Sequence, residues 1–178
     1  RAADGDECVT LDGQTRTLMS SDLVICDGEG PVALAGVMGG GNSEVCPETT
    51  DILLESAYFN PVAIRRTSKR LGLHTESSHR FERGTDVDMV PLALDRAAAL
   101  IAELAAGEVA SGVVDVYPVA LERRNVTITA TKTSQVLGLD ISAEEIQKKL
   151  SAIGLDCVVL VGSNDGAGKA EIPNYRPD

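Results

Sequence analysis

Residues 60–84 carry the clearest structural pattern of the chain and read NPVAIRRTSKRLGLHTESSHRFERG. Asn60 precedes a proline, which is typical of a helix start: the asparagine side chain caps free backbone N–H groups, and proline suits the first helical position. Glycine commonly ends a helix because it adopts left-handed backbone angles easily. The pattern therefore predicts a helix over residues 61–70 that stops at Gly72, and a short second helix over residues 77–83.

The sequence before this stretch predicts β-structure. Residues 8–11 and 15–18 are short runs rich in valine, threonine and leucine, separated by Asp12-Gly13. An Asp-Gly pair favours the two-residue type I′ turn of a β-hairpin. Further strands are expected at residues 23–26, 33–37 and 51–57.

After residue 84 the pattern first predicts a long helix over residues 90–106 and then a strand over residues 113–117. A smaller unit follows, with Ser142 and Glu145 at the spacing of a capping box. Its expected elements are strand 126–129, helix 131–137, a helix from Ser142, and strands 157–161 and 169–172. We expect a mixed α/β (α+β) fold: a domain over residues 1–120 with a mixed sheet and helices, then a small α+β domain over residues 121–178.

Composition limits the possible functions. The sequence has no apolar run long enough to cross a membrane, and its four cysteines form no CxxC pair, so neither a membrane span nor a disulfide or zinc framework is expected. These features favour a cytoplasmic location. Because the sequence begins at Arg1 and stops after a Pro-Asp pair, we expect it to be a segment of a longer chain.

The basic residues are unevenly placed. The net charge of −11 argues against non-specific binding to nucleic acid, yet six of the 16 Lys and Arg residues fall between positions 61 and 83. These are Arg65, Arg66, Lys69, Arg70, Arg80 and Arg83. A local basic tract in an acidic chain favours a specific anionic partner.

Three places are candidates for a site. Gly39, Gly40 and Gly41 follow an apolar strand, and glycines permit close approach of a ligand to the backbone, although a simple turn is the favoured interpretation. Glu55 is a carboxylate in an otherwise apolar run, where it serves a ligand or faces solvent at the end of a strand.

The third candidate is residues 72–84, which combine hydroxyl, imidazole, carboxylate and guanidinium groups. Two histidines alone do not make a typical zinc site, and the order of residues does not fit a Ser-His-Asp triad. Glu76 and Arg80 are spaced to pair on a helix, as are His79 and Glu82. A salt-bridged helix surface is therefore the alternative to a ligand site.

Three motifs, in this order, closely resemble the B3/B4 domain of the bacterial phenylalanyl-tRNA synthetase β-subunit family: AGVMGG at 35–40, LLESAYF at 53–59 and GLHTESSHRFERG at 72–84. The region from Arg124 onward resembles the start of the B5 domain of that family. The resemblance implies a site that hydrolyses the ester of tyrosine mischarged onto phenylalanine tRNA. Tyrosine differs from phenylalanine by one hydroxyl, and a site that hydrogen-bonds this hydroxyl can select tyrosine. An apolar pocket built for phenylalanine rejects tyrosine only poorly.

The resemblance also implies roles for individual residues. Glu55 would accept a hydrogen bond from the tyrosine phenol, Gly39 would leave room for the ligand, and Thr75 would line the reaction centre as the catalytic position. Ser77 stands where the family commonly has a small alanine that admits the ligand. Asp178 matches the first magnesium ligand of the family.

For the complete enzyme, the resemblance implies a class II phenylalanine-tRNA ligase that uses ATP and magnesium. Its partners would be phenylalanine tRNA, the α subunit in an α2β2 assembly, and tyrosine as editing ligand, with no DNA and no membrane. For this segment alone no cofactor is expected, and aminoacylation belongs to the α subunit. Two alternatives stay open: a non-catalytic module that presents tRNA and packs against the other subunit, and a small-molecule esterase.

Overall fold

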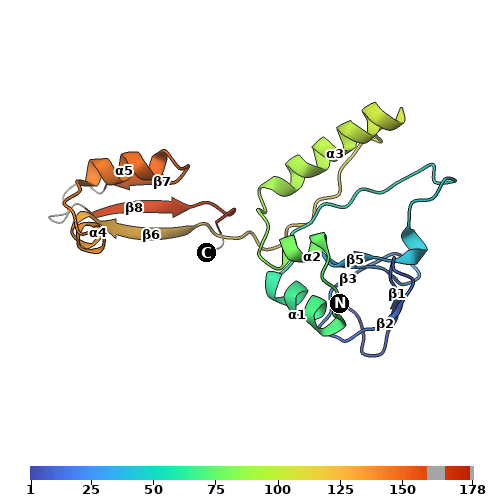
Figure 1. Cartoon of the computed structure of the whole chain (residues 1–178). Helices are drawn as coiled ribbons and strands as arrows, with labels where there is room; N and C mark the ends of the chain where they lie inside the picture. The colour runs from blue at the N-terminus through green and yellow to red at the C-terminus, as the bar shows by residue number, and fades with distance from the viewer. Residues whose placement is uncertain (160–166, 177–178) are drawn as a thin grey trace. The chain divides into compact units, whose positions relative to one another are not determined.

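The chain folds into two compact units in the computed structural model, which describes residues 1–159 and 167–176 (Figure 1). Unit 1 is Arg1–Ser111 and unit 2 is Gly112–Arg176. This division precedes the boundary expected after residue 120. Helices and antiparallel sheets occur in both units, so the predicted α+β fold class is confirmed. Within the described ranges, no helix combines the length and the apolar character that a membrane crossing needs.

Two small sheets form the first part of unit 1. Strands β1 (Glu7–Val9) and β2 (Thr15–Thr17) pair as the predicted hairpin, and β3 (Val24–Cys26), β4 (Pro31–Leu34) and β5 (Met38–Gly39) form a sheet in that order. Every strand pair in the described part of the chain is antiparallel, so the expectation of a mixed sheet is wrong. In these two sheets of unit 1 the antiparallel pairing follows from the short connections between successive strands, since a parallel pair needs a long crossover.

The hairpin turn differs from the predicted two-residue turn. Residues 10–14 connect the strands, and only Gly13 of the Asp12-Gly13 pair has a positive φ, of 75°. The Thr10 hydroxyl donates to the Asp12 carboxylate at 2.6 Å, and the Gly13 N–H donates to the Thr10 carbonyl at 2.8 Å. These bonds within the loop compete with the ladder and widen the turn.

Helices α1 (Pro61–Leu71) and α2 (Glu76–Phe81) confirm the pattern of residues 60–84. The Asn60 side chain accepts hydrogen bonds from the N–H groups of Val62 and Ala63, at 3.0 and 3.1 Å. Gly72 ends α1 in the left-handed conformation, with φ of 67°. Helix α3 (Met89–Ala105) is also as predicted, and none of its residues is buried.

The core of unit 1 lies between the strands and α1. Its buried apolar residues are Ala2, Cys8, Leu18, Leu34, Val37, Ile64 and Leu73. Phe59 and Phe81 pack beside this cluster with their ring centroids 5.0 Å apart. Gly36 has φ of 66°, and a Cβ there would lie 3.0–3.2 Å from Phe59, Ile64 and Phe81. The close packing of the aromatic pair therefore requires glycine at this turn.

Two predicted strands, 51–57 and 113–117, are absent from the structure. Both segments contain β-branched and apolar residues, but neither pairs with another described strand. Leu53 is 98% exposed. β-Propensity reflects packing against neighbouring strands, so a strand-like sequence without a partner does not form a ladder.

Unit 2 is a three-stranded antiparallel sheet with two helices. It contains β6 (Arg124–Thr129), α4 (Ala130–Leu137), α5 (Ala143–Ser151), β7 (Asp156–Val159) and β8 (Ala167–Ile172), and the sheet order is β6-β8-β7. The predicted capping box is present, with Glu145 N–H donating to Ser142 Oγ at 3.2 Å. These elements confirm the predicted order, and the expected continuation of the strand to residue 161 lies outside the described residues.

Candidate functional site

Thr75 lies at the N-terminus of α2, and its hydroxyl is bonded on both sides. It accepts from Ser78 N–H at 3.0 Å and donates to the Val37 carbonyl at 2.7 Å. Ser78 completes the capping box by accepting from Thr75 N–H at 3.0 Å. The hydroxyl therefore fixes the start of α2 against the turn between β4 and β5, and its proton is not free to leave for a base. This arrangement suits a positioning role better than a nucleophilic one.

A small polar cavity adjoins Thr75. It has a volume of about 150 Å³ and is lined by His74, Thr75, Glu76, Ser78, His79 and Glu82. Its imidazoles and carboxylates can hydrogen-bond a small polar group. Among the described residues, no group of three or more His, Cys, Asp or Glu side chains is placed to hold a metal ion.

Salt bridges occupy part of the basic tract. Arg80 pairs with Glu76 at 3.4 Å, as its spacing predicts, and Arg83 pairs with Glu82 at 2.9 Å. Both arginines are more than half exposed, so each pair adds little to stability. The predicted contact between His79 and Glu82 is not formed as a hydrogen bond.

Arg70 has a structural role. It pairs with Asp22, which is 1% exposed and also accepts from the Thr67 hydroxyl at 2.8 Å and from Met19 N–H at 2.9 Å. This buried carboxylate ties α1 to the segment that follows β2. Losing one partner of such a pair leaves a buried charge without compensation.

The glycines at 39–41 are explained by close packing of the backbone. None of them has a positive φ. A Cβ on Gly40 would lie 2.5 Å from the Val32 carbonyl oxygen, which accepts a hydrogen bond from Gly40 N–H at 2.7 Å. A Cβ on Gly39 would lie 3.1 Å from Leu11 Cδ1, so Leu11 fills the space beside Gly39. Gly41 opens a short 3-10 helix, η1 (Gly41–Ser43), in agreement with the favoured turn interpretation.

Glu55 lies on the extended segment before α1. It is exposed and makes no hydrogen bond or ion pair with the described residues, yet desolvation by neighbouring groups raises the pKa of its carboxyl above the usual range. The neighbouring Ser56 hydroxyl donates to the Val90 carbonyl at 2.8 Å, which fixes this segment to the start of α3. Glu55 is thus an uncompensated carboxylate on an anchored backbone.

The structure brings together some of the predicted residues. Thr75 and Gly39 lie at the same turn, because the Thr75 hydroxyl donates to the Val37 carbonyl and Gly39 is two residues after Val37 in the chain. Ser77 lies half-buried on α2, whereas no interaction links Glu55 to the other three. Asp178 lies outside the described residues.

Ser78 and Val37 were not singled out by the sequence, although both bond Thr75. The spacing of Thr75 and Ser78 is that of an N-cap and its third helical residue, which could have indicated the first contact. No sequence signal points to the bond with Val37, 38 residues earlier.

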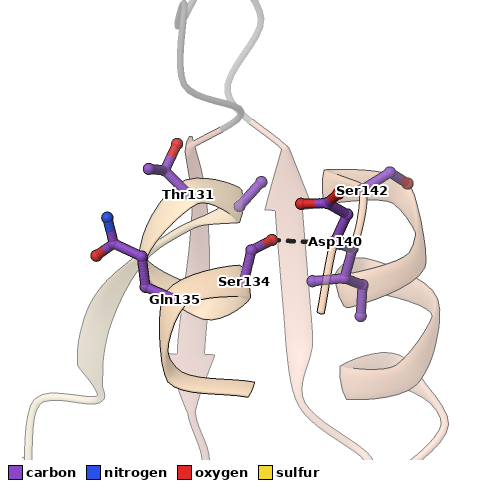
Figure 2. Close-up of a pocket in the computed structure, with 7 residues that line it drawn as sticks. Thr131, Ser134, Gln135, Asp140 and Ser142 are labelled. Atoms are coloured by element: carbon purple, nitrogen blue, oxygen red, sulfur yellow. Dashed lines mark hydrogen bonds between the residues drawn. The ribbon is translucent and has the colours of Figure 1, made fainter. Parts of the chain in front are cut away.

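A second, more open groove occurs in unit 2. Figure 2 shows it between α4 and the start of α5, with Ser134 and Gln135 on one side and Asp140 and Ser142 on the other; its volume is about 600 Å³. Ser134 Oγ accepts from Ile141 N–H at 3.2 Å. The Ser134 and Ser142 hydroxyls thus accept hydrogen bonds from the chain's own backbone, which is a structural role.

Comparisons with known proteins match the whole chain. The family model of the B3/4 domain matches residues 1–106. The chain is 54% identical, over all 178 residues, to the phenylalanine–tRNA ligase beta subunit of Syntrophotalea carbinolica, and covers 22% of that protein. It is 64% identical over 146 residues, or 82% of its length, to the beta subunit of the same name from Geobacter metallireducens, and covers 18% of it. The chain thus spans about a fifth of the length of these relatives.

Proposed function

The chain belongs to the B3/4 domain family, and from this we propose that it is the editing part of a phenylalanine–tRNA ligase β subunit. Its reaction is hydrolysis of tyrosine mischarged onto phenylalanine tRNA. The observation that carries the proposal is the 54% identity to one such beta subunit over every residue of the chain. The polar cavity beside Thr75 supports it as a place for a small polar group.

The proposed chemistry is attack of water on the ester carbonyl carbon. The bond to the terminal ribose oxygen breaks, that oxygen takes a proton, and free tyrosine and tRNA are released. Thr75 contributes by position, because its hydroxyl is committed to Val37 and to the start of α2. A fixed wall at the reaction centre can raise the rate by holding the ester in place.

Glu55 is the proposed tyrosine-selective group. Its carboxylate makes no hydrogen bond with the residues that the structure describes and can accept one from the phenol. Phenylalanine has no such donor and would leave the carboxylate unpaired, which disfavours its binding. Gly39 borders the proposed pocket, and the Leu11 side chain over it has to move before a ligand can contact the backbone there. Ser77 is small and keeps the entrance open.

The remaining assignments concern the complete enzyme. We assign residues 1–120 to the B3/B4 domain and 121–178 to the beginning of the B5 domain. The partners are phenylalanine tRNA and the α subunit in an α2β2 assembly in the cytoplasm. ATP and magnesium serve aminoacylation by that assembly. Because Asp178 is outside the described residues, no step of the editing chemistry is assigned to magnesium.

The second candidate function is a non-catalytic module that presents tRNA and packs against the other subunit. The commitment of the Thr75 hydroxyl to structure favours it, since no side chain at the cavity is arranged as an activated nucleophile. It predicts that substitutions at the proposed pocket leave hydrolysis unchanged.

The test uses the complete β subunit with its α partner. Glu55→Ala and Thr75→Trp are assayed for release of tyrosine from tyrosyl-tRNA, with Glu48→Ala as a control that removes an exposed carboxylate elsewhere in unit 1. We expect both pocket variants to lose most of the hydrolysis while aminoacylation with phenylalanine is retained. If both hydrolyse tyrosyl-tRNA as fast as the control, the editing assignment at these positions is wrong.

A further inference from the structure

Helix α1 concentrates positive charge in an otherwise acidic chain. It carries Arg65, Arg66, Lys69 and Arg70 and no acidic residue, whereas the net charge of the chain is −11. Arg70 is neutralised by the buried Asp22. The other three are exposed and make no side-chain hydrogen bond or ion pair with the described part of the chain. We call Arg65, Arg66 and Lys69 the α1 cationic face.

This charge pattern is unfavourable for the helix itself. Arg65 and Lys69 are four residues apart, as are Arg66 and Arg70, and like charges at this spacing destabilise a helix. Lys69 lies in the last turn, where the helix dipole favours a cation, but Arg65 and Arg66 lie in the middle. Arg70 is compensated by Asp22, but Arg65 and Lys69 repel each other without a compensating contact to the described residues, which points to a function.

The opposite face of α1 holds the helix in a fixed orientation. Ile64 is buried in the core, the Thr67 hydroxyl donates to Asp22 at 2.8 Å, and the Ser68 hydroxyl donates to the Leu73 carbonyl at 2.6 Å. The three cations therefore project from a rigid support. Such preorganisation lowers the entropy lost when an anionic partner binds.

The cationic face is also close to the proposed site in the chain and in space. Gly72 ends α1 and Thr75 begins α2, and the two helices contact each other (Figure 1). The cationic face therefore lies on the helix that precedes and contacts α2, and the residues that line the cavity beside Thr75 begin two residues after Gly72.

We propose that the α1 cationic face binds the phosphodiester backbone of the acceptor end of the tRNA and guides its esterified terminus toward Thr75. This rests on the proposed function. Arginine guanidinium groups bind phosphate oxygens in a bidentate manner. Successive phosphates along one strand can therefore contact successive cations along one side of a helix. Contacts of this kind are independent of base sequence and sensitive to salt.

The experiment compares two triple variants of the complete β subunit in its assembly with α. Arg65→Gln/Arg66→Gln/Lys69→Gln removes the cationic face. Lys132→Gln/Lys148→Gln/Lys149→Gln removes three exposed charges from α4 and α5 and is the matched control. Glutamine has a helix propensity close to that of lysine and arginine, so both variants should fold.

We expect the first variant to lower kcat/KM for tyrosyl-tRNA hydrolysis about tenfold, with kcat at saturation unchanged. The log–log salt dependence of tRNA binding should become shallower by roughly 1 for each phosphate group that the variant no longer binds. The control variant should match the unmodified enzyme in kcat/KM and in the salt dependence of tRNA binding. A first variant that behaves like the control overturns the proposal, as does one that loses the α subunit while its salt dependence is unchanged.

Failure of the proposed function gives a different result. If Glu55→Ala and Thr75→Trp both keep full hydrolysis, the editing assignment at these positions fails, and the salt dependence of tRNA binding still decides the role of the cationic face. If Glu55→Ala abolishes hydrolysis while the Arg65/Arg66/Lys69 variant keeps the kcat/KM and the salt dependence of the unmodified enzyme, the editing assignment stands. The proposal that the cationic face binds tRNA is then wrong.

Discussion

Replacing Thr75 with valine removes the hydroxyl while keeping the size and branching of the side chain. Two hydrogen bonds are lost, one from Ser78 N–H at 3.0 Å and one to the Val37 carbonyl at 2.7 Å. Loss of a helix N-cap costs about 1 kcal/mol. Val37 is 2% exposed, and leaving its buried carbonyl without a donor costs about 1–3 kcal/mol more. The expected destabilisation is therefore about 2–4 kcal/mol.

Amide hydrogen exchange read on peptides from α1 and α2 suits this measurement, because it reports the stability of unit 1 separately from that of unit 2. The expected loss corresponds to exchange roughly 30- to 900-fold faster in these peptides, with peptides from unit 2 unchanged. Thr75→Ser retains the hydroxyl and should exchange at nearly the original rate.

The same pair of variants separates positioning from chemistry in the complete enzyme. Thr75→Ser should retain tyrosyl-tRNA hydrolysis, and Thr75→Val should lose it together with the ordered start of α2. Exchange in Thr75→Val less than about fivefold faster than in the unmodified chain, equivalent to under about 1 kcal/mol, would refute the structural role of the hydroxyl.

Two further changes test the electrostatics. Asp22→Ala should destabilise unit 1 by about 3 kcal/mol, the lower end for a broken buried pair because Arg70 is 30% exposed. Glu76→Ala breaks an exposed pair with Arg80 and should cost less than about 1 kcal/mol; amide exchange of unit 1 peptides measures both changes. Desolvation by neighbouring groups raises the pKa of the Glu55 carboxyl above its usual value, so the folded state keeps that proton to higher pH than the unfolded chain does. The contribution of this group to stability therefore falls as the pH rises through the window between the unfolded and the folded pKa. Glu55→Gln should match the unmodified chain below the window and be more stable above it, as a pH series of urea midpoints will show; an unchanged difference across the series would contradict this.

The sequence alone determined those elements whose signals act over a few residues. The first turn of α1 is capped by Asn60, its end by Gly72, and α5 by the Ser142–Glu145 box. Each depends on hydrogen bonds or backbone angles within one or two turns, so the residue types at these spacings suffice to predict them. The three motifs that carry the family resemblance are likewise local.

Tertiary structure decided whatever depends on a distant partner. Residues 51–57 have the composition of a strand but no described strand to pair with, so Glu55 lies on an extended segment outside any sheet. Position 40 requires glycine because the Val32 carbonyl approaches its backbone closely. The Thr75 hydroxyl is engaged in a hydrogen bond because folding brings the Val37 carbonyl within reach. Such contacts form only when segments far apart in the chain pack together, and their energies do not appear in any short window of sequence.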